Sequence, residues 1–171
     1  VTVSNSEFIG NSAANGGAIF MSAGGLLTVT GTTFDGNSAS VDGGAFHTAS
    51  SAVFTAVDVI GNTAVGNGGG GVLTTAGGSA TFGDTLFSAN TAANGGAMWV
   101  VATSVDVGDT TTFDGNSAAS ATLTTYGGGV WFQAGGQAVT WTGGLFTNNL
   151  SSSAAFGAGG GMVLDANDSG T

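Results

Sequence analysis

The chain has 171 residues with no Lys and no Arg, and its ten acidic residues give it a net charge of −10. Without cationic side chains it cannot neutralise phosphate groups, which excludes nucleic-acid binding and electrostatic attraction to anionic membranes. No apolar run approaches the length of about 18 residues that a membrane-spanning helix needs, so we expect no direct membrane span.

The abundance of glycine raises the question of disorder. Gly accounts for 34 residues, yet 42% of the chain is hydrophobic, including 11 Phe and 3 Trp. Disordered chains are polar and poor in aromatic residues. We therefore expect one ordered domain over residues 1–171.

Two short motifs alternate along the chain six times. The first is an apolar residue three places before an Asn. Its apolar members are Phe8, Phe34, Val59, Phe87, Phe113 and Phe146, and its amides are Asn11, Asn37, Asn62, Asn90, Asn116 and Asn149. The second is Gly-Gly followed by Ala, Val or Met, at residues 16–18, 43–45, 70–72, 95–97, 128–130 and 160–162. Six linked copies predict a repeat architecture.

The spacing of the motifs indicates a coil with a loop at one corner. From the residue after Gly-Gly to the next Asn the distance is nearly constant, at 17 to 19 residues, whereas from Asn to the next Gly-Gly pair it varies from 5 to 12. Insertions concentrate in surface loops, so the variable half contains the loop. The unit of 25–33 residues shows no helical periodicity, which favours a coil of strands.

Three apolar columns predict three strands per coil. The first column is Val3, Val29, Phe54, Phe82, Val107 and Trp141, the second is the Phe8 to Phe146 set, and the third is Ile19, Phe46, Leu73, Met98, Trp131 and Val163. Thr, Ser and Gly alternate with them, as in half-buried strands. We predict an all-β parallel β-helix (β-solenoid) of about six coils. Its Phe side chains stack in the core, and its Asn amides form a hydrogen-bonded ladder.

The same motifs carry a family resemblance. The segments "FIGNSAANGGAIF", "FDGNSASVDGGAF" and "FSANTAANGGAMW" resemble the paired FxxN and GGA(I/L/V) motifs of polymorphic outer membrane proteins. That family comprises bacterial surface autotransporters with β-helical passenger regions and adhesive roles. The resemblance covers the whole chain at motif level. It implies a right-handed helix, an extracellular or cell-surface location, and a passenger segment of a larger adhesin as one function.

The sequence offers little for catalysis. Many β-helix proteins cleave polysaccharides, which requires a cationic base or converging carboxylates. Here the acidic residues are scattered singly among the repeats, and the one histidine, His47, adjoins Phe46 of a predicted core column. We expect no enzymatic activity.

Two groups of residues suggest Ca²⁺ as a cofactor. The segment "DANDSG" places Asp165, Asn167 and Ser169 at alternate positions of a loop resembling an EF-hand. A second group, Asp58, Asp84 and Asp109, falls near one corner of successive coils, where a hard cation would relieve charge repulsion. The alternative is that all of them are solvated turn residues.

A row of hydroxyl side chains suggests ice binding as another alternative. Its members are the outward pairs Thr2/Ser4, Thr28/Thr30, Val53/Thr55 and Thr140/Thr142. They resemble the Thr ladders of ice-binding β-helices, although Thr also suits strands in general. Gly83, Asp106 and Gly108 interrupt the row.

The two ends contain complementary half-coils. Val1 and Val3 match Leu27 and Val29 of the next coil, and joining Thr171 to Val1 would complete one further coil. Head-to-tail contacts between copies do not close, so they generate filaments. We predict a structural extracellular protein whose copies stack head to tail into a filament or surface fibre.

Adjacent apolar residues suggest a second, lateral contact. In Ile19-Phe20, Met98-Trp99 and Trp131-Phe132 only one residue of each pair can face the core of a regular strand. We predict that Phe20, Trp99 and Phe132 face outward and form a lateral interface between copies.

Overall fold

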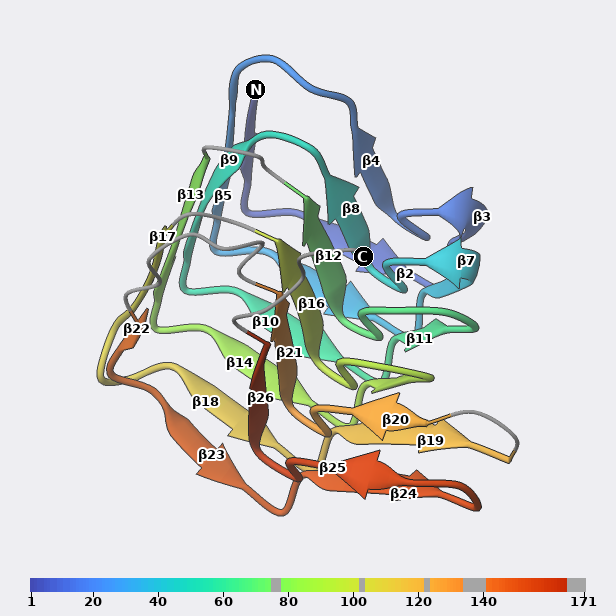
Figure 1. The fold of residues 1–171 in the computed structure, drawn as a ribbon. Coiled ribbons are helices and arrows are strands. Elements are labelled where there is room, and N and C mark those ends of the chain that lie inside the picture. Colours follow the sequence, from blue (N-terminus) through green and yellow to red (C-terminus); the bar gives the residue numbers. More distant parts are fainter. Residues whose placement is uncertain (75–77, 102–103, 122–123, 134–140, 166–171) are drawn as a thin grey trace.

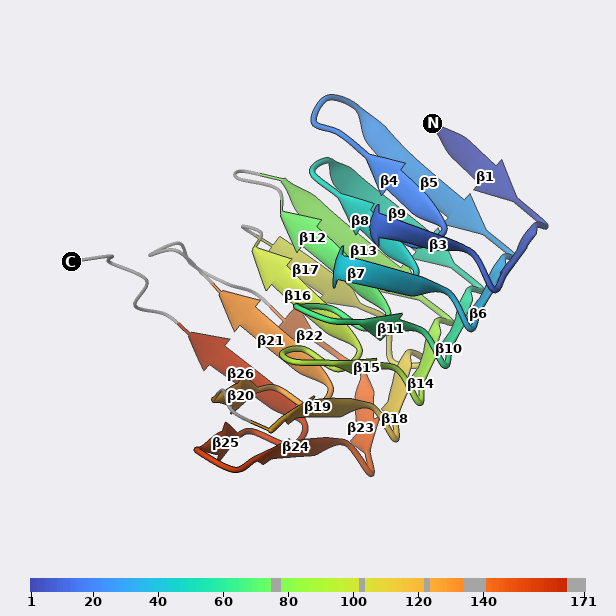
Figure 2. The same cartoon turned by 90° about the vertical axis from the view of Figure 1, so that its right-hand side faces the viewer.

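The chain forms a stack of strand-built coils (Figures 1 and 2). The computed structural model describes residues 1–74, 78–101, 104–121, 124–133 and 141–165, and all regular elements in these residues are β-strands. Strands at equivalent positions of successive coils pair in parallel. The fold class is the predicted parallel β-helix.

Each coil contributes one strand to each of four six-stranded sheets. Sheet A contains β1 (Thr2–Ser4), β5 (Leu26–Thr30), β9 (Ser51–Thr55), β13 (Ser79–Gly83), β17 (Ser104–Val107) and β22 (Trp141–Thr142). Sheet B contains β2 (Glu7–Ile9), β6 (Thr33–Asp35), β10 (Asp58–Ile60), β14 (Leu86–Ser88), β18 (Thr112–Asp114) and β23 (Leu145–Thr147).

The other two sheets complete the coil. Sheet C contains β3 (Ser12–Asn15), β7 (Ser38–Asp42), β11 (Thr63–Ala64), β15 (Thr91–Ala92), β19 (Ser117–Ser120) and β24 (Leu150–Ser153). Sheet D contains β4 (Ile19–Met21), β8 (Phe46–Thr48), β12 (Gly71–Thr74), β16 (Met98–Val101), β21 (Val130–Gln133) and β26 (Met162–Asp165). A short pair, β20 (Thr125–Tyr126) and β25 (Gly157–Ala158), links the last two coils.

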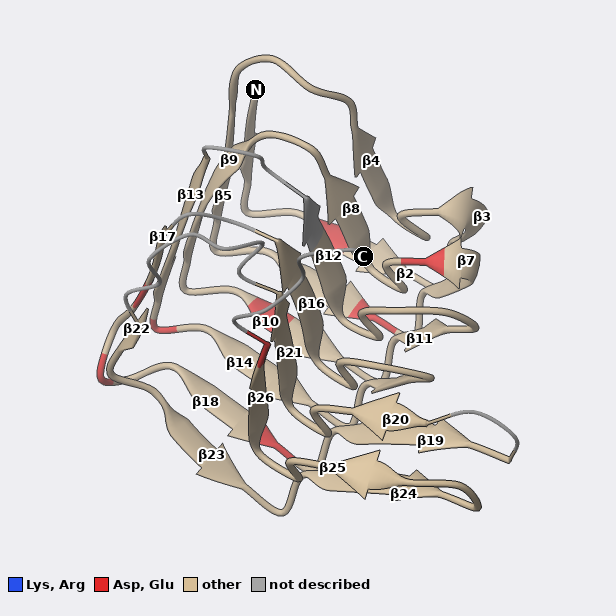
Figure 3. Cartoon of the chain, in the orientation of Figure 1, with Lys and Arg blue, Asp and Glu red and all other residues tan. Residues whose placement is uncertain are grey.

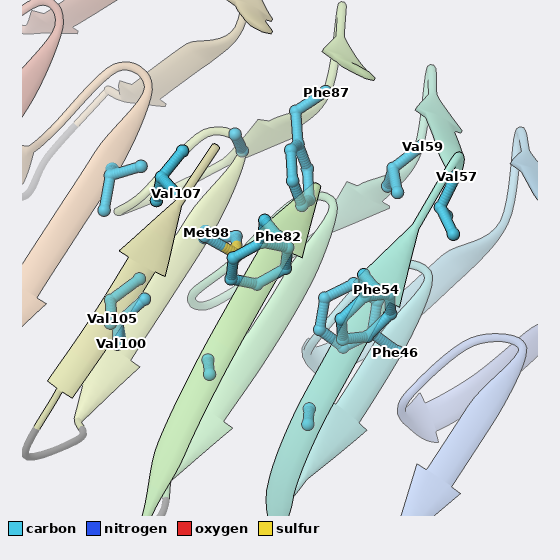
Figure 4. Close-up of a cluster of buried hydrophobic side chains, with 14 of the residues drawn as sticks. Phe46, Phe54, Val57, Val59, Phe82, Phe87, Met98, Val100, Val105 and Val107 are labelled. Carbon is cyan, nitrogen blue, oxygen red and sulfur yellow. The ribbon is translucent and has the colours of Figure 1, made fainter. Parts of the chain in front are cut away.

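The main core lies between sheets A, B and D and runs along the stack (Figure 4). Phe54 and Phe82 of sheet A stack with ring centroids 5.2 Å apart. In sheet B the column from Phe8 to Phe146 is in register, and Phe87 and Phe113 lie 5.0 Å apart with their rings 4° from parallel. Each fully buried aromatic side chain contributes about 1.5–3 kcal/mol through the hydrophobic effect.

Sheet C contributes a fourth strand to each coil, whereas the sequence predicted three strands per coil. It projects from the body as a separate row of strands (Figure 1) and has its own small cluster of Ala39, Ala64 and Ala92. Alanine is too small to stand out as an apolar column in the sequence, so the apolar pattern does not reveal this strand.

The Gly-Gly pairs let the returning chain lie directly against the backbone of the next coil, namely its glycine segment and its strand of sheet C. A Cβ added to Gly44 would lie 2.0 Å from the carbonyl oxygen of Gly69 and 2.7 Å from the backbone nitrogen of Thr63. Gly69 and Gly96 are equally confined by backbone atoms. We call this close approach of the two backbone segments the neck. It explains why the Asn motif and the Gly-Gly motif always occur together.

The register of the third column differs from the prediction in three coils. Gly71 pairs with Phe46 and Met98, so Leu73 stands two places further along β12. In β21 and β26 the residues paired with Met98 are Val130 and then Met162, instead of Trp131 and Val163. Runs of three or four glycines hide which glycine takes the left-handed conformation. In the third coil that residue is Gly68, with φ +64°.

One member of the first column is also displaced. Val107 pairs with Phe82 as predicted, but Trp141 pairs with Val105 instead of Val107. Trp141 nevertheless packs against the main core, where its ring centroid lies 5.9 Å from that of Phe113.

The neck generates a prediction about glycine substitution. Gly44→Ala should lower the free energy of unfolding by about 3 kcal/mol or more, because backbone atoms on two sides would have to move. Gly83→Ala is the matched control, since a Cβ there meets nothing within 4 Å. We expect it to change stability by less than about 1 kcal/mol. Urea unfolding followed by circular dichroism measures both, and equal losses would contradict the steric role of the neck.

Candidate functional site

The six asparagines of the first motif lie in one continuous ladder beside the neck. At each step the backbone N–H and the side-chain Nδ2 of one Asn donate to Oδ1 of the Asn in the next coil. The distances are 2.9–3.0 Å. The second hydrogen on Nδ2 is donated to a backbone carbonyl oxygen of the preceding coil. For example, Asn37 Nδ2 lies 2.8 Å from the carbonyl oxygen of Phe8. Asn62, Asn90 and Asn116 are 0% exposed, and these bonds use their full donor capacity.

The ladder explains the three-residue spacing of the first motif. The apolar residue fills the core, and its carbonyl receives the amide of the next coil, as between Phe87 and Asn116 at 2.9 Å. The residue just before the Asn turns the corner with positive φ, as at Gly36 with +61° and Ala89 with +53°. Core, corner and ladder are therefore linked within four residues.

The ladder has a direction, and its two ends differ. Within the described residues, nothing donates to Oδ1 of Asn11 in the first coil. At the other end, Asn149 donates to the Phe113 carbonyl, while its backbone N–H and second Nδ2 hydrogen have no acceptor there. In the described part of the chain, no side-chain amide donates to the carbonyl of Phe146, whereas Asn149 donates to that of Phe113. The first coil thus has a free acceptor, Asn11 Oδ1, and the last coil has two free donors, the backbone N–H and one Nδ2 hydrogen of Asn149.

A second ladder, which the sequence did not predict, stands immediately before the glycine pairs. Asn67 donates from its backbone nitrogen and from Nδ2 to Oδ1 of Asp42, at 2.7 and 3.1 Å. Asn94 Nδ2 donates to Asn67 Oδ1 at 3.0 Å, and Tyr126 N donates to Asn94 Oδ1 at 3.0 Å. The recurrence of Asn or Asp before Gly-Gly in four repeats was the signal that could have revealed it.

The acidic residues are spread over the molecule (Figure 3), and several accept hydrogen bonds from the following coil. Thr142 Oγ1 donates to Asp106 at 2.6 Å, and Thr110 donates to Asp84. Asp114 accepts from Asn148 at 2.9 Å and from Thr147 at 2.8 Å, and these bonds lower the pKa of its carboxyl group. Hydroxyl and amide donors thus take the place that cationic side chains have in other proteins.

The candidate calcium ligands Asp58, Asp84 and Asp109 do not form a cluster in the described residues. Asp58 is exposed in β10, Asp84 occupies a corner with φ +49°, and Asp109 lies in the turn before β18. Among the residues that the structure describes, no three His, Cys, Asp or Glu side chains lie close enough together to hold a metal ion. Asp165 ends β26, while its proposed partners Asn167 and Ser169 lie outside the described residues. Calcium binding stays a prediction.

The outer face of sheet D carries a row of apolar and aromatic side chains. By register its members are Phe20, His47, Val72, Trp99, Trp131 and Val163. Phe20 is 60% exposed. Trp99 stacks on Trp131, with their ring centroids 5.7 Å apart. The prediction for Phe132 was wrong, because Phe132 is 0% exposed in the core and Trp131 takes the outward position. The shift of one glycine in this coil caused the error.

His47 is half-buried in this row. The centroid of its ring lies 5.3 Å from that of Phe20, and its Nδ1 has no hydrogen-bond partner in the described part of the chain. Burial lowers the pKa of His47 below its ordinary value, and the nearby Asp42 carboxylate partly opposes this effect.

The hydroxyl row on sheet A is longer than the sequence indicated. Thr2, Thr28, Val53 and Thr81 share one outward column, followed by Asp106 and Thr142. Ser4, Thr30 and Thr55 share the second column, which then reaches Gly83. Thr140 lies outside the described residues. Ice binding stays a prediction.

Comparison with known proteins identifies the repeats. Residues 5–22 and 31–49 match the family model of the Chlamydia polymorphic membrane protein repeat. The first two coils are therefore similar to repeats of the polymorphic membrane protein family. Both matched stretches run from before the ladder Asn into sheet D, so they contain the neck of the first two coils. Comparisons with curated proteins and with solved structures gave no match.

This repeat type and the β-solenoid fold together fit a surface-associated bacterial protein. In the described ranges, no helix has the length and apolarity needed to cross a membrane.

The buried ladder generates a prediction about stability. Asn90→Ala removes the Oδ1 that accepts two hydrogen bonds from buried donors of Asn62, so it should lower the free energy of unfolding by about 3 kcal/mol or more. Asn11→Ala at the exposed end of the ladder should cost about 1 kcal/mol. Chemical denaturation of both variants measures the difference. If the two variants had equal free energies of unfolding, the buried asparagines of the ladder would stabilise the fold no more than the exposed one.

The environment of His47 generates a prediction about pH. Its pKa is lowered in the folded chain, so the unfolded chain binds a proton first as the pH falls. Stability should therefore be constant above about pH 7 and decline as the pH drops below about 6.5. Thermal unfolding between about pH 5 and 8 measures this decline, and His47→Gln should remove it. A decline that persists in the variant would assign it to other groups.

Proposed function

We propose that the chain is a rigid structural module of a bacterial surface protein, and that copies of it stack head to tail through their coil ends. The observation that carries this proposal is the directional Asn ladder, whose open acceptor at Asn11 matches the open donors at Asn149. Repeat type and fold favour a structural or adhesive role over a catalytic one. The corresponding location is the cell surface or the extracellular space.

The contact between two copies would repeat an inner step of the ladder. Asn149 N and Nδ2 would donate to Oδ1 of the partner's Asn11, and Nδ2 of that residue would donate to the Phe146 carbonyl. The core would continue as well, because Phe8 and Phe146 are partly buried members of the same stack. Three hydrogen bonds of about 1 kcal/mol each correspond to roughly a hundredfold in the association constant.

Most of the exposed large apolar side chains in the described residues lie on the same two coils, and the others are Leu26, Val41 and Val65. Val1, Ile9 and Phe20 of the first coil and Leu145, Leu150, Phe156 and Leu164 of the last coil are 55–75% exposed. Burying such side chains favours association. A lateral contact through Phe20, Trp99 and Trp131 on sheet D would be additional to end-to-end stacking.

A second candidate function is a passenger segment of a larger surface adhesin. It is favoured by the match to a repeat of membrane proteins, whose coils would continue the solenoid within one polypeptide. The ladder ends would then bind further coils of the same chain. Both candidates use the same coil-end chemistry, and they differ in whether the isolated 171-residue chain associates.

Sedimentation and electron microscopy of the isolated chain test head-to-tail stacking. We expect end-to-end rods whose length grows with protein concentration and with ionic strength, because salt screens the repulsion between copies of net charge −10. Asn11→Ala should weaken association roughly a hundredfold, and Ser4→Ala, an exposed change in the same coil, should not. Single short rods under all conditions would reject stacking and leave the passenger segment. Protease treatment of intact cells would then test surface exposure.

A further inference from the structure

Three Asn-Gly sequences occupy equivalent places at the neck. They are Asn15-Gly16, Asn67-Gly68 and Asn94-Gly95, each with the glycine at positive φ. In an Asn-Gly sequence the glycine nitrogen can attack Cγ of the Asn side chain. This attack forms a cyclic imide and releases ammonia, and water then opens the ring to aspartate or isoaspartate. The reaction needs no oxidant or metal, but the carboxamide must rotate toward the glycine nitrogen.

The second ladder prevents this rotation at two of the three sequences. Asn67 is held at both ends of its carboxamide, since Nδ2 donates to Asp42 and Oδ1 accepts from Asn94. Asn94 is also held at both ends, by Asn67 and by the backbone nitrogen of Tyr126. To reach the glycine nitrogen, either carboxamide would have to break two hydrogen bonds.

Asn15 lacks this restraint. It is paired with Asp42 in sheet C, but the Asp42 carboxylate has no hydrogen to donate, so Oδ1 of Asn15 does not receive the bond that Asn94 gives to Asn67. Within the described residues, no hydrogen bond restrains its side chain. The nitrogen of Gly16 donates to the Asp42 carbonyl at 3.0 Å, much as Gly68 and Gly95 donate at 2.9 and 2.8 Å. The three sites therefore differ in the carboxamide and not in the attacking nitrogen.

We propose that Asn15 is a site of spontaneous deamidation in the folded chain, whereas the second ladder protects Asn67 and Asn94. The Gly16 nitrogen bonds to Cγ of Asn15 as it loses its proton, and the Cγ–Nδ2 bond breaks with release of ammonia. Water then hydrolyses the imide. The product carries one more negative charge, opposite Asp42 in the next coil.

The modification would loosen the neck of the first coil. Two carboxylates facing each other in adjacent strands repel. Isoaspartate also inserts a methylene into the backbone just before Gly16, where an added Cβ would already lie 2.1 Å from the Ile19 carbonyl oxygen. If copies stack as proposed above, this change would weaken the first coil as a docking end. The chemistry at Asn15 does not depend on stacking.

Peptide mapping by mass spectrometry tests the site. The folded chain is incubated in mildly alkaline buffer at a concentration where sedimentation shows single chains, then digested with pepsin in acid, because trypsin has no Lys or Arg to cleave. We expect deamidation at Asn15 to be at least about tenfold faster than at Asn67 or Asn94. In denaturant the three rates should converge. Equal rates in the folded chain, or slower reaction at Asn15, would overturn the proposal.

A substitution at Asp42 tests the cause of the protection. Asp42→Ala removes the acceptor of Asn67 Nδ2, so deamidation at Asn67 should rise about tenfold while Asn94 stays slow. Asp42→Asn retains the acceptor oxygen and should leave Asn67 slow. An unchanged rate at Asn67 in Asp42→Ala, or an equal rise at Asn94, would refute protection by the ladder.

Discussion

The amide hydrogen bonds that run along the axis of the stack hold successive coils together at the corner beside the neck. There the chain leaves the body and returns with only glycine between the two backbone segments. No side chain can fill this space, so the asparagine carboxamides replace hydrophobic contact with directed bonds. Each inner Asn joins three coils, since it donates to the next coil and to the preceding one and accepts from the latter. The rest of the fold depends on these links staying in register.

The same axial arrangement accommodates the unusual charge of the chain. Isolated carboxylates would repel along a stack of coils, and no Lys or Arg is present to pair with them. Thr and Asn donors one coil further along bind Asp42, Asp106 and Asp114 instead. At Asp114 the hydrogen bonds favour the ionised carboxylate and lower its pKa. The carboxamides at the two ends of the first ladder carry no charge, so charge repulsion does not act directly between these groups.

Directionality connects the fold to its proposed role. A ladder that donates in one direction ends with an acceptor on one side and donors on the other, so only head-to-tail continuation satisfies both. This holds whether the next coil belongs to the same polypeptide or to another copy. The second ladder donates in the opposite direction, from later coils to earlier ones, and it is broken where Asp42 stands in place of Asn.

The sequence by itself determined the repeat, the parallel β-helix and the column of Phe8 and its equivalents, because stacked coils force equivalent residues into the same environment. It also placed the Asn motif correctly beside that column. Only the tertiary structure decided the fourth strand, whose Ala39 and Ala64 are too small to form a visible apolar pattern. It also decided which of Trp131 and Phe132 faces the core, because in a run of glycines the turn is chosen by hydrogen bonding to the neighbouring coil. Such a choice depends on bonds to other coils, for example from the Gly127 nitrogen to the Ala158 carbonyl oxygen, and local spacing does not contain it.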